Sequence, residues 1–523
     1  MTAIKSPRLI TCSLLFAGAA LIVIAASPTG GDLKRTLQAL EYQRFLTLAL
    51  LGIGSVLFLW GMRSLTRKGG QESQTWWGLS RLAGGMLFML LAGVAIIRPL
   101  FEEDISNAGR LSTLSDADLS NTGPPLAGAA DWPQWLGPHR DGHSSETGLN
   151  TDWQTKRPPE VWRKPLGGGY SSIIQVQNRL YTMDRQGSNE RVVCLDATTG
   201  NSLWNHSYLV DYSGMRDGYT EGPRATPCYH DGRLYTIGAT GIFHCLEVPQ
   251  QGQTPRVLWR HDLITMFNAP LPRWGVACSP LIEGDLVIAQ PGGPEGSVAA
   301  FHRVTGEVQW KALGDRPGYS SPVTATLGGV RQIVCFTGEN VAGLRANDGK
   351  LLWSYPWATT HDANTATPIL VGKCVFISSG YNKGCALLEI QGEGADSLKA
   401  VPLYVRLRKL MCNHHSNCVL HDGHLYGSDD NNGIWRCVNV RSFNQTWFNR
   451  GPGKGCLIYA DGHFLILSEH GDLALVEANP QHYVEKGRFE VFDIGRTWAT
   501  PTLSQGRLYL RSNQEVVCLD LRK

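Results

Sequence analysis

The sequence predicts an all-β protein, an eight-bladed propeller of four-stranded antiparallel blades, preceded by an N-terminal helical membrane region. Three observations predict the propeller. From residue 131 onward a unit recurs at spacings of about 40 to 54 residues, the size of one blade. Each unit alternates short apolar strands with turn residues, and most units end in a tryptophan. No long helical period follows residue 131.

Each unit opens with a small polar residue, often followed by proline. A short strand, a turn such as Asp231-Gly232 and a second strand ending near Leu-Tyr follow. The last unit stops before its fourth strand, whereas Glu160–Arg163 precedes the first opening. We therefore expect this N-terminal strand to complete the C-terminal blade and to remove free sheet edges. Seven blades remain the alternative, if the seventh unit is irregular. The eight openings are Ser172, Thr226, Ser279, Ser321, Thr367, Asn417, Cys456 and Thr500.

Tryptophans occupy equivalent positions at the ends of the units. Such periodic placement favours packing between blades over catalysis. Tyr404 and Phe492 take the same place in the fifth and seventh units. The predicted blade-docking residues are Trp162, Trp204, Trp259, Trp310, Trp353 and Trp447.

The N-terminal hundred residues differ from the rest in composition. Three apolar stretches, residues 9–26, 45–62 and 79–97, are each long enough to cross a bilayer. The first is either a retained anchor or a cleaved signal peptide. We therefore divide the chain into a membrane region with three predicted transmembrane helices (1–100), a flexible Ser-, Asp- and Gly-containing tether (101–130) and the propeller (131–523).

Basic residues around these stretches predict the orientation. Lys5 and Arg8 precede the first stretch, and Arg63, Arg67 and Lys68 follow the second, which places both sites in the cytoplasm. The propeller then lies on the periplasmic, extracytoplasmic side of a multi-pass inner-membrane protein. The net charge of the whole chain is only +3, which argues against a nucleic-acid partner.

The turns after the third strands carry a finer motif. Val193-Cys194-Leu195-Asp196-Ala197-Thr198-Thr199-Gly200 leads to Trp204, and similar turns lead to Trp310 and Trp353. This pattern resembles the PQQ-like β-propeller repeat, A-x-D-x-x-T-G-x-x-x-W, over roughly 390 residues. The stretch that begins Trp132-Pro133-Gln134-Trp135 also resembles the start of membrane-anchored bacterial envelope proteins of this group.

The resemblance implies a fold shared by quinoprotein dehydrogenases and by the propeller lipoprotein of outer-membrane assembly, so the fold alone does not choose a function. The dehydrogenases bind PQQ between a vicinal Cys-Cys disulfide and a tryptophan, with Ca²⁺ held by Glu, Asn and Asp. This chain has no Cys-Cys pair and no C-x-x-C-H haem motif. No cofactor is therefore assigned, and PQQ with Ca²⁺ is kept as the alternative.

Cysteine and histidine spacing indicates no metal site. Twelve of the 13 cysteines lie in the propeller, several at apolar strand positions where cysteine packs as a small hydrophobe. The pairs Cys412–Cys418 and Cys374–Cys385 are close enough in sequence to form disulfides. His414 and His415 are adjacent and point to opposite faces of an extended strand, which argues against a shared ion. Gly167–Gly169 is interpreted as a flexible turn beside the channel.

Residues two positions before each opening recur around one face of the central channel. Aromatic and cationic side chains dominate them, a combination that can hold an anionic or sugar-like ligand by stacking and charged hydrogen bonds. Plugging of the channel by these side chains is the alternative interpretation. The predicted channel-face ring is Tyr170, Arg224, Trp274, Tyr319, His415, Lys454 and Trp498, with Trp274 standing in for Ala277, and Thr365 in the fifth unit.

Three functions fit these observations. The first is a membrane-tethered extracytoplasmic scaffold that binds a ligand or envelope proteins and catalyses no reaction. The second is a PQQ-dependent membrane quinoprotein oxidoreductase acting on alcohols or sugars. The third is a carbohydrate-binding module using Tyr170, Tyr319 and Trp498. No catalytic residue is assigned, since no nucleophile elbow, P-loop or zinc-protease motif is present.

Overall fold

The computed structural model describes residues 131–523 except 217–218, 250–252, 409, 431–432 and 494. Contacts divide the chain into Met1–Glu103 and Asp104–Lys523, and the described residues all belong to the second unit. Within the described part, no helix is long and apolar enough to span a membrane. The predicted membrane spans and tether lie outside the described residues.

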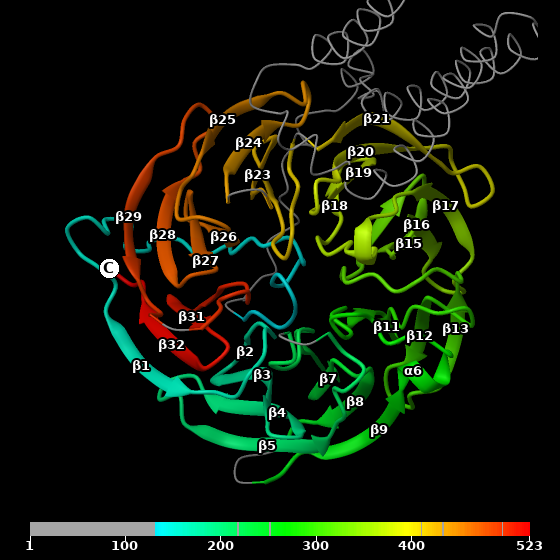
Figure 1. Ribbon diagram of the computed structural model, residues 1–523, viewed down its shortest axis with the longest axis horizontal. Coiled ribbons are helices and arrows are strands. Elements are labelled where there is room, and N and C mark those ends of the chain that lie inside the picture. Colours follow the sequence, from blue (N-terminus) through cyan, green and yellow to red (C-terminus); the bar gives the residue numbers. More distant parts are fainter. Residues whose placement is uncertain (1–130, 217–218, 250–252, 409, 431–432, 494) are drawn as a thin grey trace, which may run out of the picture. The chain divides into compact units, whose positions relative to one another are not determined.

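The described residues form eight four-stranded antiparallel sheets arranged as the blades of a propeller (Figure 1). Seven blades follow the chain, and the eighth has the order β1-β32-β31-β30. The prediction of eight blades and of closure by the N-terminal strand is therefore confirmed. Trp162 lies opposite Cys518 in the closing pair. The short helices are α6 (Leu263–Met266) and η3 (Thr360–Asp362).

The strands of each blade run from the central channel outward. Blade 1 comprises β2 (Ile174–Val176), β3 (Arg179–Gln186), β4 (Asn189–Asp196) and β5 (Ser202–Leu209); blade 2 comprises β6 (Cys228–His230), β7 (Arg233–Ile237), β8 (Ile242–Glu247) and β9 (Arg256–Asp262); blade 3 comprises β10 (Leu281–Glu283), β11 (Leu286–Ala289), β12 (Val298–His302) and β13 (Val308–Ala312); and blade 4 comprises β14 (Val323–Leu327), β15 (Val330–Phe336), β16 (Asn340–Arg345) and β17 (Leu351–Pro356).

The second half of the ring has the same plan. Blade 5 comprises β18 (Ile369–Val371), β19 (Cys374–Ser379), β20 (Gly384–Gln391) and β21 (Lys399–Leu407); blade 6 comprises β22 (Val419–His421), β23 (His424–Ser428), β24 (Trp435–Asn439) and β25 (Gln445–Asn449); blade 7 comprises β26 (Gly455–Ala460), β27 (His463–Ser468), β28 (Asp472–Glu477) and β29 (Glu485–Glu490); and blade 8 comprises β30 (Thr502–Ser504), β31 (Arg507–Arg511), β32 (Glu515–Asp520) and β1 (Glu160–Pro165).

The small polar opening residues join neighbouring blades around the channel. Thr226 Oγ1 accepts a hydrogen bond from the backbone N–H of Ser172 at 3.1 Å, and Ser279 Oγ accepts one from Thr226 at 2.9 Å. The backbone N–H of Thr500 donates to Ser172 Oγ at 2.9 Å, which connects the last blade to the first. A side-chain oxygen is needed because these buried N–H groups have no ladder partner. This requirement explains the recurrence of Ser and Thr in the sequence.

Tryptophans at the blade ends dock onto the turn of the next blade. Trp310 Nε1 donates to the backbone oxygen of Ala346 at 3.1 Å, and its ring covers Gly349. A Cβ at Gly349 would lie 2.5 Å from that ring, and the glycine has a φ of +72°. Glycine is therefore required both for space and for backbone conformation. Trp162, Trp259 and Trp447 likewise donate to carbonyls of the next blade, whereas Trp353 bonds Gln332 of its own blade.

All twelve described cysteines are buried, and none is joined to another described cysteine by a disulfide. The two cysteine pairs considered from the sequence are not joined. Strand register explains the first pair, since Cys385 lies opposite Ser378 and Cys374 lies opposite Glu389. In the second pair, Cys418 Sγ lies 2.9 Å from Asn413 Oδ1.

Candidate functional site

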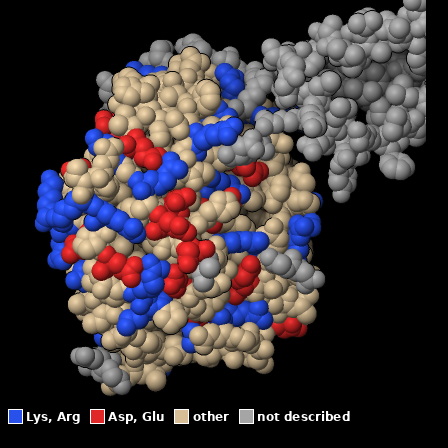
Figure 2. All heavy atoms as spheres, turned by 60° about the vertical axis from the view of Figure 1, so that its left-hand side comes forward, with Lys and Arg blue, Asp and Glu red and all other residues tan. Residues whose placement is uncertain are grey.

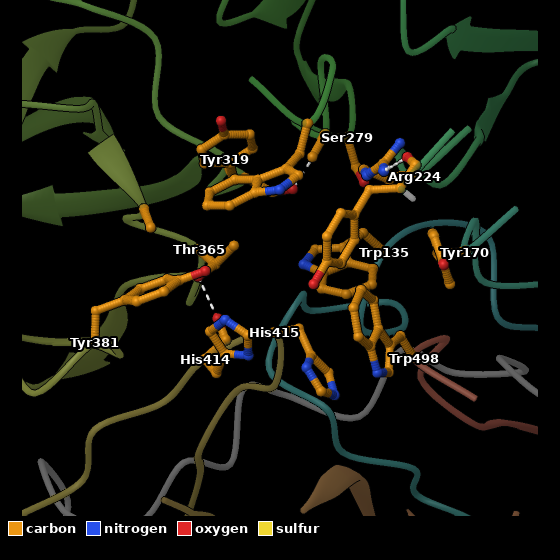
Figure 3. Close-up of a pocket in the computed structure, with 15 residues that line it drawn as sticks. Trp135, Tyr170, Arg224, Ser279, Tyr319, Thr365, Tyr381, His414, His415 and Trp498 are labelled. Atoms are coloured by element: carbon orange, nitrogen blue, oxygen red, sulfur yellow. Dashed lines mark hydrogen bonds between the residues drawn. The ribbon is translucent and has the colours of Figure 1, made fainter. Parts of the chain in front are cut away.

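The channel mouth on the side of the blade openings leads into a cavity of about 940 Å³ that is partly open to solvent (Figure 3). Six of the seven residues of the predicted channel-face ring line this cavity, together with Ala277 and Thr365 at two further ring positions. Their ligand-binding role stays a prediction. The complete lining is Trp135, Tyr170, Tyr219, Arg224, Trp274, Ala277, Ser279, Tyr319, Ser321, Ala363, Thr365, Tyr381, His414, His415 and Trp498.

Lys454 is the ring residue that does not line the cavity. Its ammonium group lies 3.2 Å from Glu469 and 3.4 Å from His414 Nδ1. Glu469 also accepts a hydrogen bond from Trp498 Nε1 at 3.3 Å. Lys454 therefore lies outside the cavity and supports two lining side chains, His414 directly and Trp498 through Glu469.

Six lining side chains form a continuous belt of ring contacts, which we call the aromatic belt. It draws on loops from five blades, so no single sequence segment reveals it. Each ring touches the next, and the last returns to the first. The centroid distances are 4.7 Å for Trp498–His415, 5.5 Å for His415–His414, 4.9 Å for His414–Tyr381, 6.1 Å for Tyr381–Trp274, 6.3 Å for Trp274–Tyr219 and 6.2 Å for Tyr219–Trp498.

Residues 131–144, which we call the plug segment, occupy the centre of the ring of blades (cyan in Figure 1). Trp132 exchanges two backbone hydrogen bonds with Gln175 of β2, at 2.8 and 2.9 Å. The N–H of Tyr459 in β26 donates to the oxygen of Gly142 at 2.8 Å. The segment is thus anchored to the inner strands of blades 1 and 7, which flank blade 8.

Trp135 projects from the plug segment into the cavity wall. Its Nε1 donates to Thr367 Oγ1 at 3.0 Å. Arg140 of the same segment is buried and donates to the oxygens of Pro280 and Ser279 at 2.9 and 3.3 Å. Sequence reasoning noted this stretch only for its resemblance to envelope proteins. Its position in the channel depends on contacts with distant parts of the chain, among them Gln175, Thr367 and Tyr459, for which a single sequence carries no signal.

Four polar atoms on the cavity wall are buried and have no hydrogen-bond partner among the described protein groups. They are the hydroxyl oxygen of Tyr170, Nε1 of Trp274 and both ring nitrogens of His415. Burial, with Lys454 and His414 nearby, holds the pKa of His415 well below its usual value. The imidazole is therefore neutral near pH 7 and offers one donor and one acceptor. Buried polar groups of this kind favour a ligand with hydroxyl or carbonyl groups.

Arg224 is the cation within the cavity wall. Its guanidinium donates to the backbone oxygens of Gly222, at 3.0 Å, and Tyr219, and lies 5.4 Å from the centre of the Tyr170 ring. Burial lowers the pKa of Arg224. The guanidinium nevertheless remains charged near pH 7, because the pKa of an arginine starts far above this pH. The lining contains no carboxylate, so the charge of the wall itself is positive.

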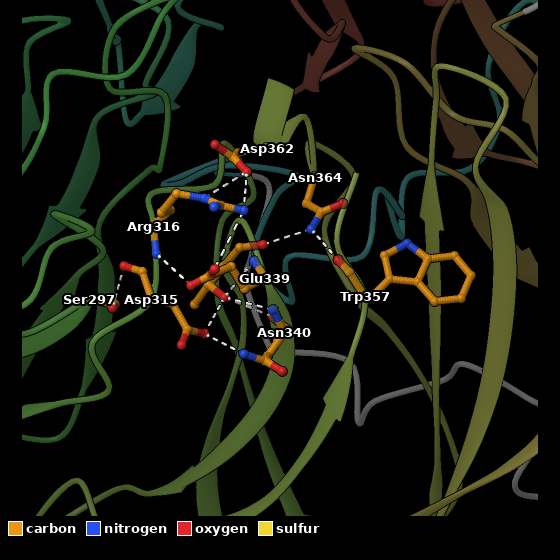
Figure 4. Close-up of polar contacts among 9 residues, drawn as sticks. Ser297, Asp315, Arg316, Glu339, Asn340, Trp357, Asp362 and Asn364 are labelled. Atoms are coloured by element: carbon orange, nitrogen blue, oxygen red, sulfur yellow. Dashed lines mark hydrogen bonds and ion pairs between the residues drawn. The ribbon is translucent and has the colours of Figure 1, made fainter. Parts of the chain in front are cut away.

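A polar network in blade 4 holds one side of the cavity (Figure 4). Arg316 contacts the carboxylates of Asp362 and Glu339 at 3.0 and 3.4 Å. Asn364 donates to the oxygens of Thr337 and Trp357 at 2.7 and 2.9 Å. The oxygen of Asn364 in turn accepts from the backbone N–H of Tyr319 at 2.9 Å. This network fixes the loops that present Tyr319 and Thr365.

The glycines before Tyr170 form a rigid support and not the flexible turn expected from the sequence. The N–H of Gly167 donates to Asp184 Oδ2 at 2.7 Å. Gly168 exchanges backbone hydrogen bonds with Arg185 at 3.0 and 2.8 Å. A Cβ at Gly168 would collide with the oxygen of Glu221. Glycine is required here for close backbone approach.

A buried cluster between blades 1 and 2 supports the loop that carries Tyr219 and Arg224. Glu190 accepts hydrogen bonds from Tyr208, at 2.6 Å, and from Tyr212 of that loop. His244 packs 4.6 Å from Tyr208, ring centre to ring centre, and 4.9 Å from His206. Burial lowers the pKa of His244 to about 3, and it also lowers the pKa of His206.

This cluster predicts a pH dependence of stability. The unfolded chain binds a proton at His244 below about pH 6.5, whereas the folded protein leaves it neutral down to about pH 3. The contribution of His244 to the free energy of unfolding is therefore constant above about pH 6.5. It falls as the pH drops below this value, by up to about 1.4 kcal/mol per pH unit. We expect His244→Leu to flatten the decline of the urea midpoint between pH 7 and pH 4. His482→Leu, at an exposed site, is the control, and equal slopes in wild type and His244→Leu would contradict the assignment.

The fold and the lined cavity define a β-propeller with a candidate binding site in its central channel. Residues 188–447 match the sequence family described as outer membrane protein assembly factor BamB, a family of PQQ-like repeats. The resemblance to the PQQ-like β-propeller repeat is therefore confirmed. No curated protein matches the sequence.

Solved structures share the fold at low sequence identity. Quinohemoprotein alcohol dehydrogenase from Comamonas testosteroni is 13% identical, with a TM-score of 0.54 over 79% of this chain and 83% of that chain. Quinohemoprotein alcohol dehydrogenase ADHIIG from Pseudomonas putida HK5 is 12% identical, with a TM-score of 0.52 over 77% and 82%. BamB from Moraxella catarrhalis is 13% identical, with a TM-score of 0.47 over 69% and 97%.

The lining does not fit the PQQ–Ca²⁺ arrangement that the resemblance implies. Calcium prefers carboxylate and amide oxygens, and the cavity lining contains neither Asp, Glu, Asn nor Gln. No cysteine lines the cavity, and no disulfide joins two described cysteines. Among the described residues no group of three or more His, Cys, Asp or Glu is placed to hold a metal ion. Trp135 and Arg224 could contact a planar anion, but the metal ligands and a carboxylate base are not at this site.

Proposed function

We propose that this protein is a membrane-tethered, extracytoplasmic binding scaffold of the bacterial envelope whose propeller captures a ligand in the central cavity without catalysing a reaction. The aromatic belt supports this proposal. It provides ring faces on several sides of one cavity, and Trp274 and His415 in the cavity wall carry buried polar atoms that have no hydrogen-bond partner among the described protein groups. The membrane tether and the extracytoplasmic location rest on the apolar N-terminal stretches and the distribution of basic residues in the sequence.

The surface outside the cavity is consistent with a scaffold. On the face shown in Figure 2, Lys and Arg side chains are interspersed with Asp and Glu. Such a mixed surface lacks the continuous basic stripe of a nucleic-acid binder. Envelope proteins are therefore the proposed macromolecular partners, with the cavity reserved for a small molecule.

Dye binding tests whether the cavity takes up an aromatic anion. The purified full-length chain in detergent is titrated with anilinonaphthalene sulfonate, an aromatic anion that fluoresces when bound in apolar surroundings. Ala277→Trp fills the cavity, and we expect it to weaken saturable binding by at least about tenfold. Ser202→Trp adds the same side chain on the exposed outer strand β5 and should leave binding unchanged.

Two results would overturn the proposal. Equal dye binding by wild type and Ala277→Trp would show that the cavity is not the binding site. Saturable binding of PQQ in the presence of Ca²⁺, with dye-linked oxidation of an alcohol or sugar, would establish the quinoprotein alternative.

A further inference from the structure

Three exposed arginines surround the mouth of the cavity, and we call them the arginine crown. They are Arg216, Arg273 and Arg496, and they come from the loops before blades 2, 3 and 8. None belongs to the cavity lining described above. Each guanidinium lies over a ring of the aromatic belt, 5.6 Å from Tyr219 for Arg216, 5.6 Å from Trp274 for Arg273 and 5.3 Å from Trp498 for Arg496.

The crown is held in place by contacts that leave its charge largely uncompensated. The backbone N–H of Arg216 donates to the backbone oxygen of Arg273 at 2.9 Å, which joins the two loops that carry these cations. Arg273 Nη1 lies 3.2 Å from Nδ1 of His361, a neutral acceptor. Among the described residues, the crown's ion pair is that of Arg496 with Glu221, at 3.5 Å. Stacking on the rings fixes the planar guanidinium groups and leaves their N–H edges for a ligand.

The buried polar atoms of the cavity wall indicate which chemical groups a ligand would place below the arginine crown. Trp274 Nε1 is a donor, and neutral His415 is both a donor and an acceptor, and the two residues come from the loops of blades 3 and 6. Hydroxyl groups, which donate and accept, satisfy both kinds of atom. A flat aromatic molecule places few hydroxyls around its edge, whereas a sugar ring distributes them on all sides and packs its C–H faces on aromatic rings.

We propose that the ligand is an anionic sugar, a pyranose that carries a carboxylate or phosphate group. Its ring lies against the aromatic belt with its hydroxyls on Trp274 and His415, and its anionic group binds the arginine crown. This inference rests on the proposed function and specifies the ligand of the same cavity. Arginine suits this role because its guanidinium binds carboxylate and phosphate in a bidentate manner.

The experiment compares four probes by calorimetry on the purified full-length chain. Glucuronate and glucose-1-phosphate are anionic sugars, glucose is the neutral sugar, and benzoate is a flat aromatic anion. We expect both anionic sugars, or the one whose anion fits the crown, to bind at least about tenfold more tightly than glucose and benzoate. The preference should shrink in 1 M salt, where the screening length is about 3 Å. The relative affinity of the two anionic sugars distinguishes a carboxylate from a phosphate ligand.

Charge removal tests the crown itself. The triple variant R216A/R273A/R496A should bind the anionic sugar no more tightly than glucose while glucose binding is unchanged. The matched control, R256A/R345A/R522A, removes the same charge from exposed or half-exposed sites outside the channel mouth and should behave as wild type. Binding of both anionic sugars no tighter than that of glucose, tighter binding of benzoate, or full affinity in the crown variant would overturn the inference. If no sugar binds but anilinonaphthalene sulfonate still binds and is lost in Ala277→Trp, the inference fails and the proposed function stands.

Discussion

Replacing Trp310 by alanine is expected to lower the free energy of unfolding by about 3–5 kcal/mol. The Trp310 side chain is 93% shielded from solvent and covers Gly349, and its indole N–H bonds the oxygen of Ala346. Alanine leaves a void between blades 3 and 4 that the rigid turn cannot fill. Urea denaturation followed by circular dichroism measures the loss.

Two variants separate packing from the hydrogen bond. Trp310→Phe keeps an aromatic ring and should cost less than half as much, since it removes mainly the indole N–H and part of the ring area. Phe448→Ala is the control, because Phe448 on β25 is 63% exposed. A change below about 1 kcal/mol for Trp310→Ala would show that the docking contacts do not hold these blades together.

The repeat made the fold predictable from the sequence. The prediction of eight blades closed by β1 followed from the eight openings, the turn motif and the absence of a fourth strand in the last unit. Local chemistry accounts for this success. The turn at Gly349, for example, must adopt a positive φ next to a tryptophan. This local requirement selects glycine at that position, so the sequence motif reveals it.

The candidate site was predictable only where it follows the repeat. Counting two positions back from each opening located Tyr170, Arg224 and His415 on the cavity wall. Trp135 and Tyr381 lie outside that register, because one comes from the plug segment and the other from the turn between β19 and β20. Their places depend on long-range packing, which a periodic pattern does not encode.

The same reasoning explains the wrong prediction for Gly167–Gly169. Three consecutive glycines usually indicate freedom of the backbone, but here they allow two chain segments to approach closely. The partners in this close approach are Arg185 and Glu221, and the glycine carbonyls also accept hydrogen bonds from a side chain far away in sequence, Arg511 of β31. An arginine at the end of an alternating strand is expected to be exposed to solvent, whereas Arg511 is buried.

Replacing Arg511 by methionine is expected to lower the free energy of unfolding by about 3–5 kcal/mol. The guanidinium donates to the backbone oxygens of Met183, Ser171 and Gly169 at 2.8, 2.9 and 3.1 Å, and burial lowers its pKa to about 10. It therefore remains charged near neutral pH. Methionine has a similar volume but removes the hydrogen bonds that the guanidinium donates to these buried carbonyls. Urea denaturation again provides the measurement.

The position of Arg511 predicts a second, independent effect. Its strand belongs to blade 8, and the carbonyls it binds belong to blade 1 and to the glycines before Tyr170, so it connects the ring closure to the cavity wall. We expect Arg511→Met to weaken binding of anilinonaphthalene sulfonate as well as stability. Arg507→Met, on the same strand but with a single bond to Ala197, should lose less of both. A stable Arg511→Met protein with unchanged dye binding would show that Tyr170 is positioned by other contacts, and the Asp184 bond to Gly167 would then be the first to test.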